Sequence, residues 1–233
     1  MQIIVNHLTR MKGSRICIAG IAPATFAHVR PVTPPSDLIT RNLLRENGGP
    51  FAVGTLVDLG EATPQPTAPE TEDHRFHTRN VRLVEEVSPD VYWEMLGEIA
   101  CDTLLKAFGA ELEPKGRGYA VEEGQGVRSL AVLRVRGRPQ LALDGYGKLR
   151  LSLRYPDDKA SLGVNDVRFY EPDHQAIRED VVAAVNRRLR RGIQAFAMLG
   201  LARAWRASGD DRDRHYLQVN GLCLADNPTG DTP

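Results

Sequence analysis

The sequence predicts a mainly β fold with helices (α+β), organised as two modules in one chain. Three observations support this prediction: short β-branched segments divided by Gly and Pro recur, two stretches have helical periodicity, and the two halves differ in charge. With 233 residues, 42% of them hydrophobic, the chain is long enough for one large domain or two small ones.

The charge of the chain is divided between its halves, although the formal net charge is zero. Residues 58–113 hold thirteen acidic and four basic side chains, whereas residues 128–154 hold seven basic and one acidic. This asymmetry indicates two modules with different surfaces. We expect a first module with an acidic C-terminal helix at 1–112, a linker at 113–126, a second module at 127–225 and a flexible tail at 226–233.

Short strands dominate the first module. A polar stretch at 63–74 lacks periodicity and is expected to be an exposed loop. Ser88 is the expected N-cap of a helix that has Pro89 in its first position and Gly109 as its stop. The expected strands lie at 3–5, 15–21, 28–32, 53–62 and 81–87.

The second module has a clearer order of elements. Strands are expected at 129–135, 139–147, 149–155 and 161–170, a helix at about 173–191, and two further strands at 193–205 and 215–224. Strands or hairpins, then one helix, then two strands is the order of an OB-fold barrel, in which a helix lies between the third and fourth strands. A generic α+β sandwich is the alternative.

The cysteines and the N-terminal segment bear on redox chemistry and location. Cys17, Cys101 and Cys223 are widely spaced and form no CxxC pair, which argues against a disulfide framework and a zinc knuckle. The start lacks the apolar core of a signal peptide, and no run reaches the roughly 18 apolar residues of a membrane span. We expect a soluble, cytoplasmic protein with no membrane partner, no metal and no cofactor.

Four stretches together resemble a known family. They are LTRMKGSRICIAGI at 8–21, HVRPV at 28–32, LGVNDVRFYEP at 162–172, and the pair LGLARAW at 199–205 with RHYLQVNGLCL at 214–224. In order and spacing they are similar to the dual-OB-domain proteins of bacterial conflict and defence loci. The resemblance implies two OB barrels and a sensor of nucleic acid or a nucleotide, in a defence system whose effector partner supplies catalysis.

OB barrels that bind single strands combine a groove of positive charge with rings that stack on bases. Arg150 and Arg154 alternate with leucines and should point away from the core. Arg10, Arg15 and Arg30 flank the apolar strands of the first module. We expect nucleic-acid contacts from Arg150, Arg154, Arg168, Arg203, Tyr216, Gln218 and Asn220, with Arg10 and Arg30 as a second patch. Rings are also available at Tyr155, Phe169, Trp205 and His215, and an ordinary solvated strand face is the alternative.

Two other functions remain open. The first is a protein–protein adaptor that uses OB folds, for which the acidic segment 85–113 is the expected surface. The second is a metal-dependent hydrolase that uses the cluster of Asp210, Asp211, Asp213 and His215. The aspartates alternate with arginines that can neutralise them, which is typical of a charged turn. We therefore expect no catalytic residues and a protein that is not an enzyme.

Overall fold

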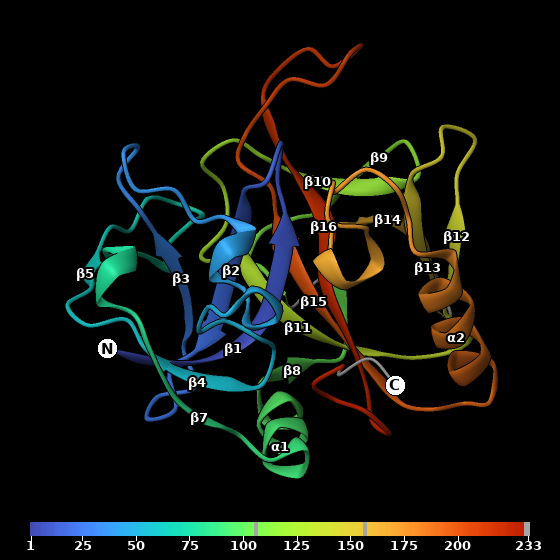
Figure 1. Ribbon diagram of the computed structural model, residues 1–233. Helices are drawn as coiled ribbons and strands as arrows, with labels where there is room; N and C mark the ends of the chain where they lie inside the picture. The colour runs from blue at the N-terminus through green and yellow to red at the C-terminus, as the bar shows by residue number, and fades with distance from the viewer. Residues whose placement is uncertain (105–106, 156–157, 231–233) are drawn as a thin grey trace.

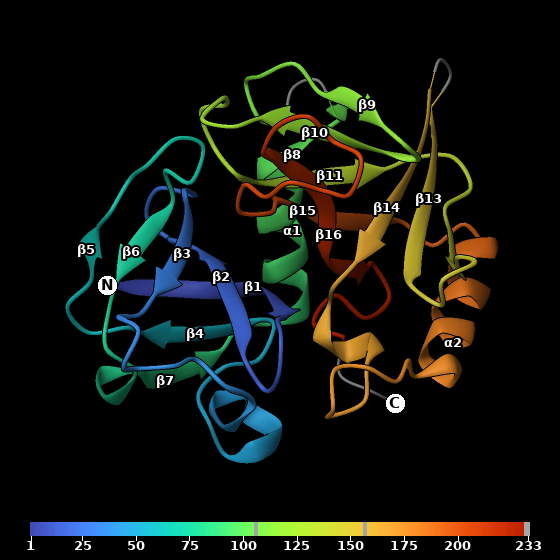
Figure 2. The same cartoon turned by 90° about the horizontal axis from the view of Figure 1, so that it is seen from above.

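Two β-sheets lie side by side in the computed structural model, which describes residues 1–104, 107–155 and 158–230 (Figures 1 and 2). The first sheet comes from the N-terminal third of the chain and the second from the remainder. Two α-helices accompany the strands among the described residues. The predicted mainly β fold with helices is therefore confirmed.

The first sheet is built around β1. This strand pairs antiparallel with β2 on one side and with β4 on the other, and β3 pairs in parallel with β6. The apolar residues of β1 and β2 are buried, as their β-branched sequences predict. In sheet order the strands are β5 (Thr63–Pro64), β6 (Asp73–Arg75), β3 (His28–Val32), β2 (Ile16–Ile21), β1 (Gln2–Arg10), β4 (Thr55–Asp58) and β7 (Arg82–Glu86).

The second sheet contains the longest strand, β16. Its start pairs with β10, and the rest pairs antiparallel with β15 and in parallel with β14. Three strands therefore pair with the edges of β16. In sheet order the strands are β12 (Gln140–Leu143), β13 (Leu149–Tyr155), β14 (Asp158–Val164), β16 (Arg214–Leu224), β15 (Ala195–Leu201), β11 (Leu130–Val135) and β8 (Ala100–Cys101).

The two α-helices differ in how closely they follow the sequence prediction. Ser88 caps α1 (Pro89–Ile99), because its hydroxyl accepts a hydrogen bond from the Val91 N–H at 3.3 Å. The helix ends at Ile99 and not at Gly109, because the next two residues form β8 and pair with β11. In α2 (Glu179–Arg190) the predicted apolar stripe packs on the second sheet. Neither helix is long and apolar enough to cross a membrane, as judged from the described residues.

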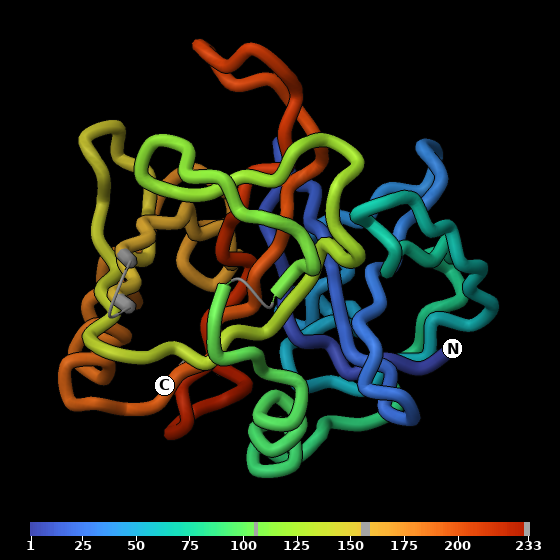
Figure 3. Tube along the Cα trace, turned by 180° about the vertical axis from the view of Figure 1, so that it is seen from behind, coloured from blue at the N-terminus to red at the C-terminus, as the bar shows by residue number. Residues whose placement is uncertain are grey.

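The expected linker and the expected tail both pack against the second sheet. Residues 113–122 form β9 (Glu113–Lys115) and β10 (Gly118–Glu122), and β10 pairs with β16 (Figure 3). The linker prediction is therefore wrong for these residues. Asp226 forms an ion pair with Arg188, and the Thr229 carbonyl accepts a hydrogen bond from Arg168, so residues 226–230 are anchored. Residues 231–233 of the expected tail lie outside the described residues.

The two sheets share one hydrophobic cluster. Phe196 and Met198 of β15 pack with residues of β1, β2 and β4. Tyr92 of α1 is fully buried, and its hydroxyl donates to the carbonyl of Asn6 at 3.1 Å. The stabilising free energy of the hydrophobic effect is proportional to the apolar area removed from water. This shared cluster therefore holds the two modules together.

A buried carboxylate ties the two sheets together at their edge. Glu72 precedes β6, and one of its oxygens accepts hydrogen bonds from the N–H groups of Ser129 and Leu130 at 2.8 and 2.9 Å. Its other oxygen accepts from the Ser129 hydroxyl at 3.0 Å. Such charge-assisted bonds to backbone N–H groups are among the stronger hydrogen bonds in proteins. The start of β11 is thereby fixed against the first module.

His7 lies where β1 crosses β16. Gly221 of β16 leaves room for it, since a methyl group at position 221 would lie 2.9 Å from the His7 Cβ. Burial lowers the pKa of His7 to about 3, and the nearby His28, Arg30 and Arg168 contribute in the same direction. The imidazole is therefore neutral in the folded protein at pH values where it is protonated in the unfolded chain.

Acidification below pH 6.5 is expected to lower the free energy of unfolding, because the unfolded state then binds a proton at His7 that the folded state does not. The contribution is about 1.4 kcal/mol per pH unit down to about pH 3. Urea unfolding at pH 7.0, 6.0 and 5.0 measures this slope. His7→Gln should remove this share of the slope and leave the share of His28, whose pKa burial lowers to about 4. The same substitution at the exposed His77 should not reduce the slope in this way. Equal slopes in the wild type and His7→Gln would contradict the prediction.

Candidate nucleic-acid interface

A cleft of about 900 Å³ lies between the two modules. Its walls come from the end of β1, the start of β2, β3 and the loop after it, the chain after β15, and β16. Five of the nine expected contact residues line it together: Arg10, Arg30, Arg203, Gln218 and Asn220. Residues from both ends of the sequence thus meet in one cleft.

Positive charge dominates the lining of the cleft. Lys12 and Arg15 join the three predicted arginines, and no Asp or Glu is found among the described residues that line it. Lys12 was missed by the sequence prediction, although the run TRMKGSR places three basic side chains within seven positions. Cations grouped this way, with apolar walls, concentrate the electrostatic potential in the cleft.

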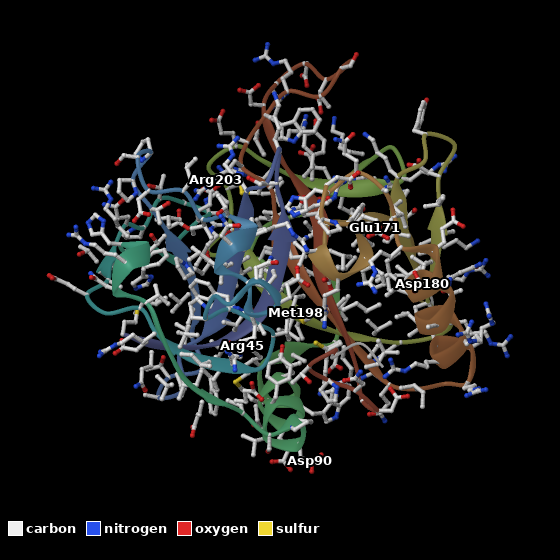
Figure 4. The ribbon with its side chains drawn as sticks, viewed as in Figure 1. Arg45, Asp90, Glu171, Asp180, Met198 and Arg203 are labelled. Carbon is white, nitrogen blue, oxygen red and sulfur yellow. The ribbon has the colours of Figure 1, made fainter. Side chains whose placement is uncertain are left out.

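One carboxylate bridges two of the cleft arginines. The Arg30 Nε donates to Asp73 at 2.6 Å, and Arg203 donates to the other oxygen of the same carboxylate. Arg203 also lies 3.4 Å from a Glu70 oxygen. Arg30 is buried, whereas 57% of the Arg203 side chain is exposed, near the end of β1 (Figure 4). Arg203 is therefore the accessible member of the pair, and Arg30 holds the carboxylate in place.

Arg10 is held by contacts from the second module. Its Nη1 donates to the carbonyl of His174 at 2.8 Å, and its guanidinium lies 4.1 Å from the centre of the Tyr170 ring. A cation over an aromatic face is attracted by the ring quadrupole. These contacts fix the direction in which Arg10 faces the cleft before any ligand binds.

The polar floor of the cleft is a row of amides. Asn165 donates to Gln218 at 2.8 Å, and Gln218 donates to Asn220 at 2.8 Å. The Asn220 amide lies 3.4 Å from His7 Nε2 and depends on Gly200, where any side chain would overlap it. Gln218 and Asn220 alternate with buried apolar residues, as the sequence predicted. The row is therefore preorganised to donate and accept hydrogen bonds.

A second hollow of about 840 Å³ begins where the cleft ends, since Trp205 lines both. Two more of the expected contact residues, Arg150 and Tyr216, line this hollow. The Arg150 Nε donates to the Ser161 hydroxyl at 3.0 Å, which keeps the guanidinium along the strand surface. The other charged and aromatic lining residues are Lys115, Arg117, Tyr119, Asp144, Tyr146 and Lys148.

Arg168 and Arg154 line neither the cleft nor the second hollow. Arg168 donates from Nε at 3.0 Å and from Nη2 at 2.7 Å to Asp166, and its Nη2 also donates to the Leu222 carbonyl at 3.0 Å. Its role as a nucleic-acid contact is corrected: the guanidinium is occupied by an internal ion pair. Arg154 is exposed on β13.

Two of the expected stacking rings are in the interior. Phe169 lies in the core of the second module. His215 is buried, with Nδ1 2.9 Å from the Ala202 carbonyl and Nε2 accepting from the Gly124 N–H at 3.3 Å. Neither ring can stack on a base, which corrects the prediction for both. The side chain of Tyr155 lies outside the described residues.

The aspartate cluster forms a network of ion pairs on the projecting loop before β16 (Figure 1). Asp210 accepts from the Tyr216 hydroxyl at 2.7 Å and lies 3.2 Å from Arg214 and 3.4 Å from Lys115. The Tyr216 hydroxyl, and then Arg214, hold the pKa of Asp210 well below its usual range. Asp213 pairs with Arg206 at 3.1 Å. Within the described part of the chain, no three His, Cys, Asp or Glu side chains converge to hold a metal ion.

Comparison with known proteins identifies a family and a remote structural likeness. A comparison with curated proteins gives no match. Among solved structures, the chain is similar to a murine DNA-binding protein bound to double-stranded DNA, with 6% identity and a TM-score of 0.34, over 100% of this chain and 97% of the other. A TM-score this low does not indicate a shared fold or function. The model of the dual OB-containing domain matches residues 1–222, and the chain therefore belongs to the dual OB-containing domain family.

Proposed function

We propose that the chain binds nucleic acid or a nucleotide in the cleft between its two modules and catalyses no reaction itself. The observation that supports this proposal is the convergence of five cationic side chains and a row of amides from distant parts of the sequence. Phosphates would lie against the cations, which supply most of the affinity for a nucleic acid. Base edges would meet Gln218 and Asn220, which can donate and accept hydrogen bonds.

Binding is expected to weaken steeply as salt increases, because each phosphate held by a cation releases a condensed counterion. If the four cleft cations other than the buried Arg30 engage phosphates, the plot of log K against log salt has a slope of roughly −2.8 to −3.6. Fluorescence anisotropy of labelled 12-nucleotide DNA and RNA, at 50 to 200 mM salt, measures the slope. Affinity should fall roughly a hundredfold over that range.

Two double variants test the location of binding: one removes two charges inside the cleft, and the other removes two charges outside it. Lys12→Ala with Arg15→Ala should reduce the slope by about 2, because two phosphate contacts are lost. Arg79→Ala with Arg82→Ala removes two exposed arginines outside the cleft and should leave the slope unchanged. No binding at 50 mM salt, or affinity that does not respond to salt, would refute the proposal.

The same proposal places the protein in the cytoplasm, in a bacterial defence system, with an effector protein that supplies catalysis. The candidate contact for such a partner is the outer face of α1 and the strand before it. Glu85, Glu86, Asp90, Glu94 and Glu98 are exposed there. Co-purification with a protein encoded beside this gene, lost on Glu94→Lys with Glu98→Lys, would support it. Retention by that variant would exclude this face.

A further inference from the structure

Trp205 is an exposed ring at the junction of the cleft and the second hollow. Half of its surface is accessible, and it lines both spaces. Its ring centre lies 4.8 Å from that of Tyr216 at an angle of 46°. An exposed ring that lines a cationic groove can stack on the base of a single strand.

Tyr216 is held in a fixed position beside Trp205. Its hydroxyl donates to Asp210, whose carboxylate is in turn held by Arg214 and Lys115. Tyr216 and Gln218 lie two positions apart on β16 and therefore on one face of the strand. Tyr216 lines the hollow and Gln218 lines the cleft, so this face of β16 runs from one space into the other.

The second hollow is lined by cationic side chains and aromatic rings, as are protein surfaces that bind single-stranded nucleic acid. Lys115, Arg117, Lys148 and Arg150 line it, against the one carboxylate of Asp144 among the described lining residues. Asp144 accepts hydrogen bonds from the N–H groups of its own turn and lies 3.7 Å from Arg150. Tyr146 at the tip of that turn is 90% exposed.

We infer that the ligand of the proposed site is a single-stranded nucleic acid that runs from the cleft across Trp205 into the second hollow, with one base stacked on the Trp205 ring. This inference rests on the proposed function and extends it to a strand spanning both spaces. A duplex pairs and stacks its bases internally, so their faces cannot reach a protein ring. An unpaired base offers that face, and stacking on an aromatic side chain is worth about 1–3 kcal/mol per base by alanine substitution.

The chain offers a direct optical test because it has two tryptophans. Trp93 packs on Phe196 with ring centres 4.4 Å apart, away from both spaces. Trp93→Phe therefore leaves Trp205 as the sole indole. Its fluorescence is followed during titration with an unlabelled 12-nucleotide strand of DNA or RNA, the same sequence as a duplex, and a mononucleotide. Anisotropy of a labelled strand measures binding independently.

Saturating single strand should quench the Trp205 emission by half or more, and the duplex should leave it unchanged. In the otherwise wild-type chain, Trp205→Ala should weaken single-strand binding about tenfold, within the range expected for one lost stack. Trp205→Phe should restore most of the affinity. Trp205 is exposed, so circular dichroism should report unchanged folding for both variants.

The outcomes separate this inference from the proposed function. Binding by anisotropy without quenching would overturn the stacked base and leave the cleft proposal standing. Equal quenching and equal affinity for the mononucleotide and the strand would overturn the continuous track. Absence of any binding at 50 mM salt would overturn the proposed function itself. Quenching by RNA alone or by DNA alone would support the track and identify the sugar.

Discussion

Asp166→Ala is expected to lower the free energy of unfolding by about 3 kcal/mol, at the lower end of the range for breaking a buried ion pair. The Asp166 side chain is 1% exposed and accepts hydrogen bonds from Arg168 and from the Leu222 N–H at 3.1 Å. Its removal leaves the Arg168 guanidinium without a counter-ion. We expect the lower end because Arg168 keeps 21% of its side-chain surface in contact with water.

The state of Arg168 explains why this loss is large. Burial opposes its charge, yet Asp166 more than compensates and raises the pKa of the guanidinium above its usual value. Without Asp166 the arginine remains charged, since its pKa is too high for it to release a proton near neutral pH. The cost therefore appears as destabilisation of the fold.

The measurement is urea unfolding followed by circular dichroism at pH 7, with Asp58→Ala as the matched control. Asp58 pairs with the N-terminal amine and with Arg82, which is 77% exposed. Surface pairs of this kind contribute up to about 1 kcal/mol. Similar midpoints for the two variants would mean that the Asp166–Arg168 ion pair does not stabilise the fold. The denaturant slope should stay constant, which identifies the change as one in stability.

Local signals in the sequence predicted much of the fold. Alternating apolar residues defined β13 and β16, and helical spacing defined α2. Ser88 and Pro89 placed the start of α1. The end of α1 was misplaced because β8 has two residues, and its pairing depends on β11, about thirty positions away. No periodicity can be read from so short a strand.

The residues of the site could be predicted only where their positions depend on local periodicity. The alternation on β16 identified Tyr216, Gln218 and Asn220 from the sequence, because their shared face depends on the local period alone. Tyr216 and Gln218 are partly exposed as predicted, whereas Asn220 is buried. In the sequence Arg168, like Arg150, stands between two apolar residues of a predicted strand. Only the folded chain brings the Leu222 and Thr229 carbonyls to the Arg168 guanidinium, so its structural role had no local signal. The cleft likewise required the tertiary arrangement, since Arg10 and Arg203 belong to different modules.

Arg203→Ala is expected to weaken single-strand binding by roughly ten- to a hundredfold at 100 mM salt and to reduce the salt slope by about 1. Two effects combine in this variant. A phosphate contact is lost, and the carboxylates of Glu70 and Asp73 beneath the arginine lose a partner and become a source of repulsion. Arg82→Ala removes the same charge from an exposed site outside the cleft and should change affinity less than twofold.

A double variant separates the two effects. Glu70→Gln keeps the size of the buried side chain and removes one of the uncovered charges. If repulsion contributes, Glu70→Gln with Arg203→Ala should bind more tightly than Arg203→Ala alone, while the salt slope stays reduced. Equal affinity would mean that the phosphate contact accounts for the whole loss. An unchanged affinity in Arg203→Ala itself would mean that the strand does not bind in the cleft. Arg203 is the accessible one of the two cleft arginines that Asp73 bridges.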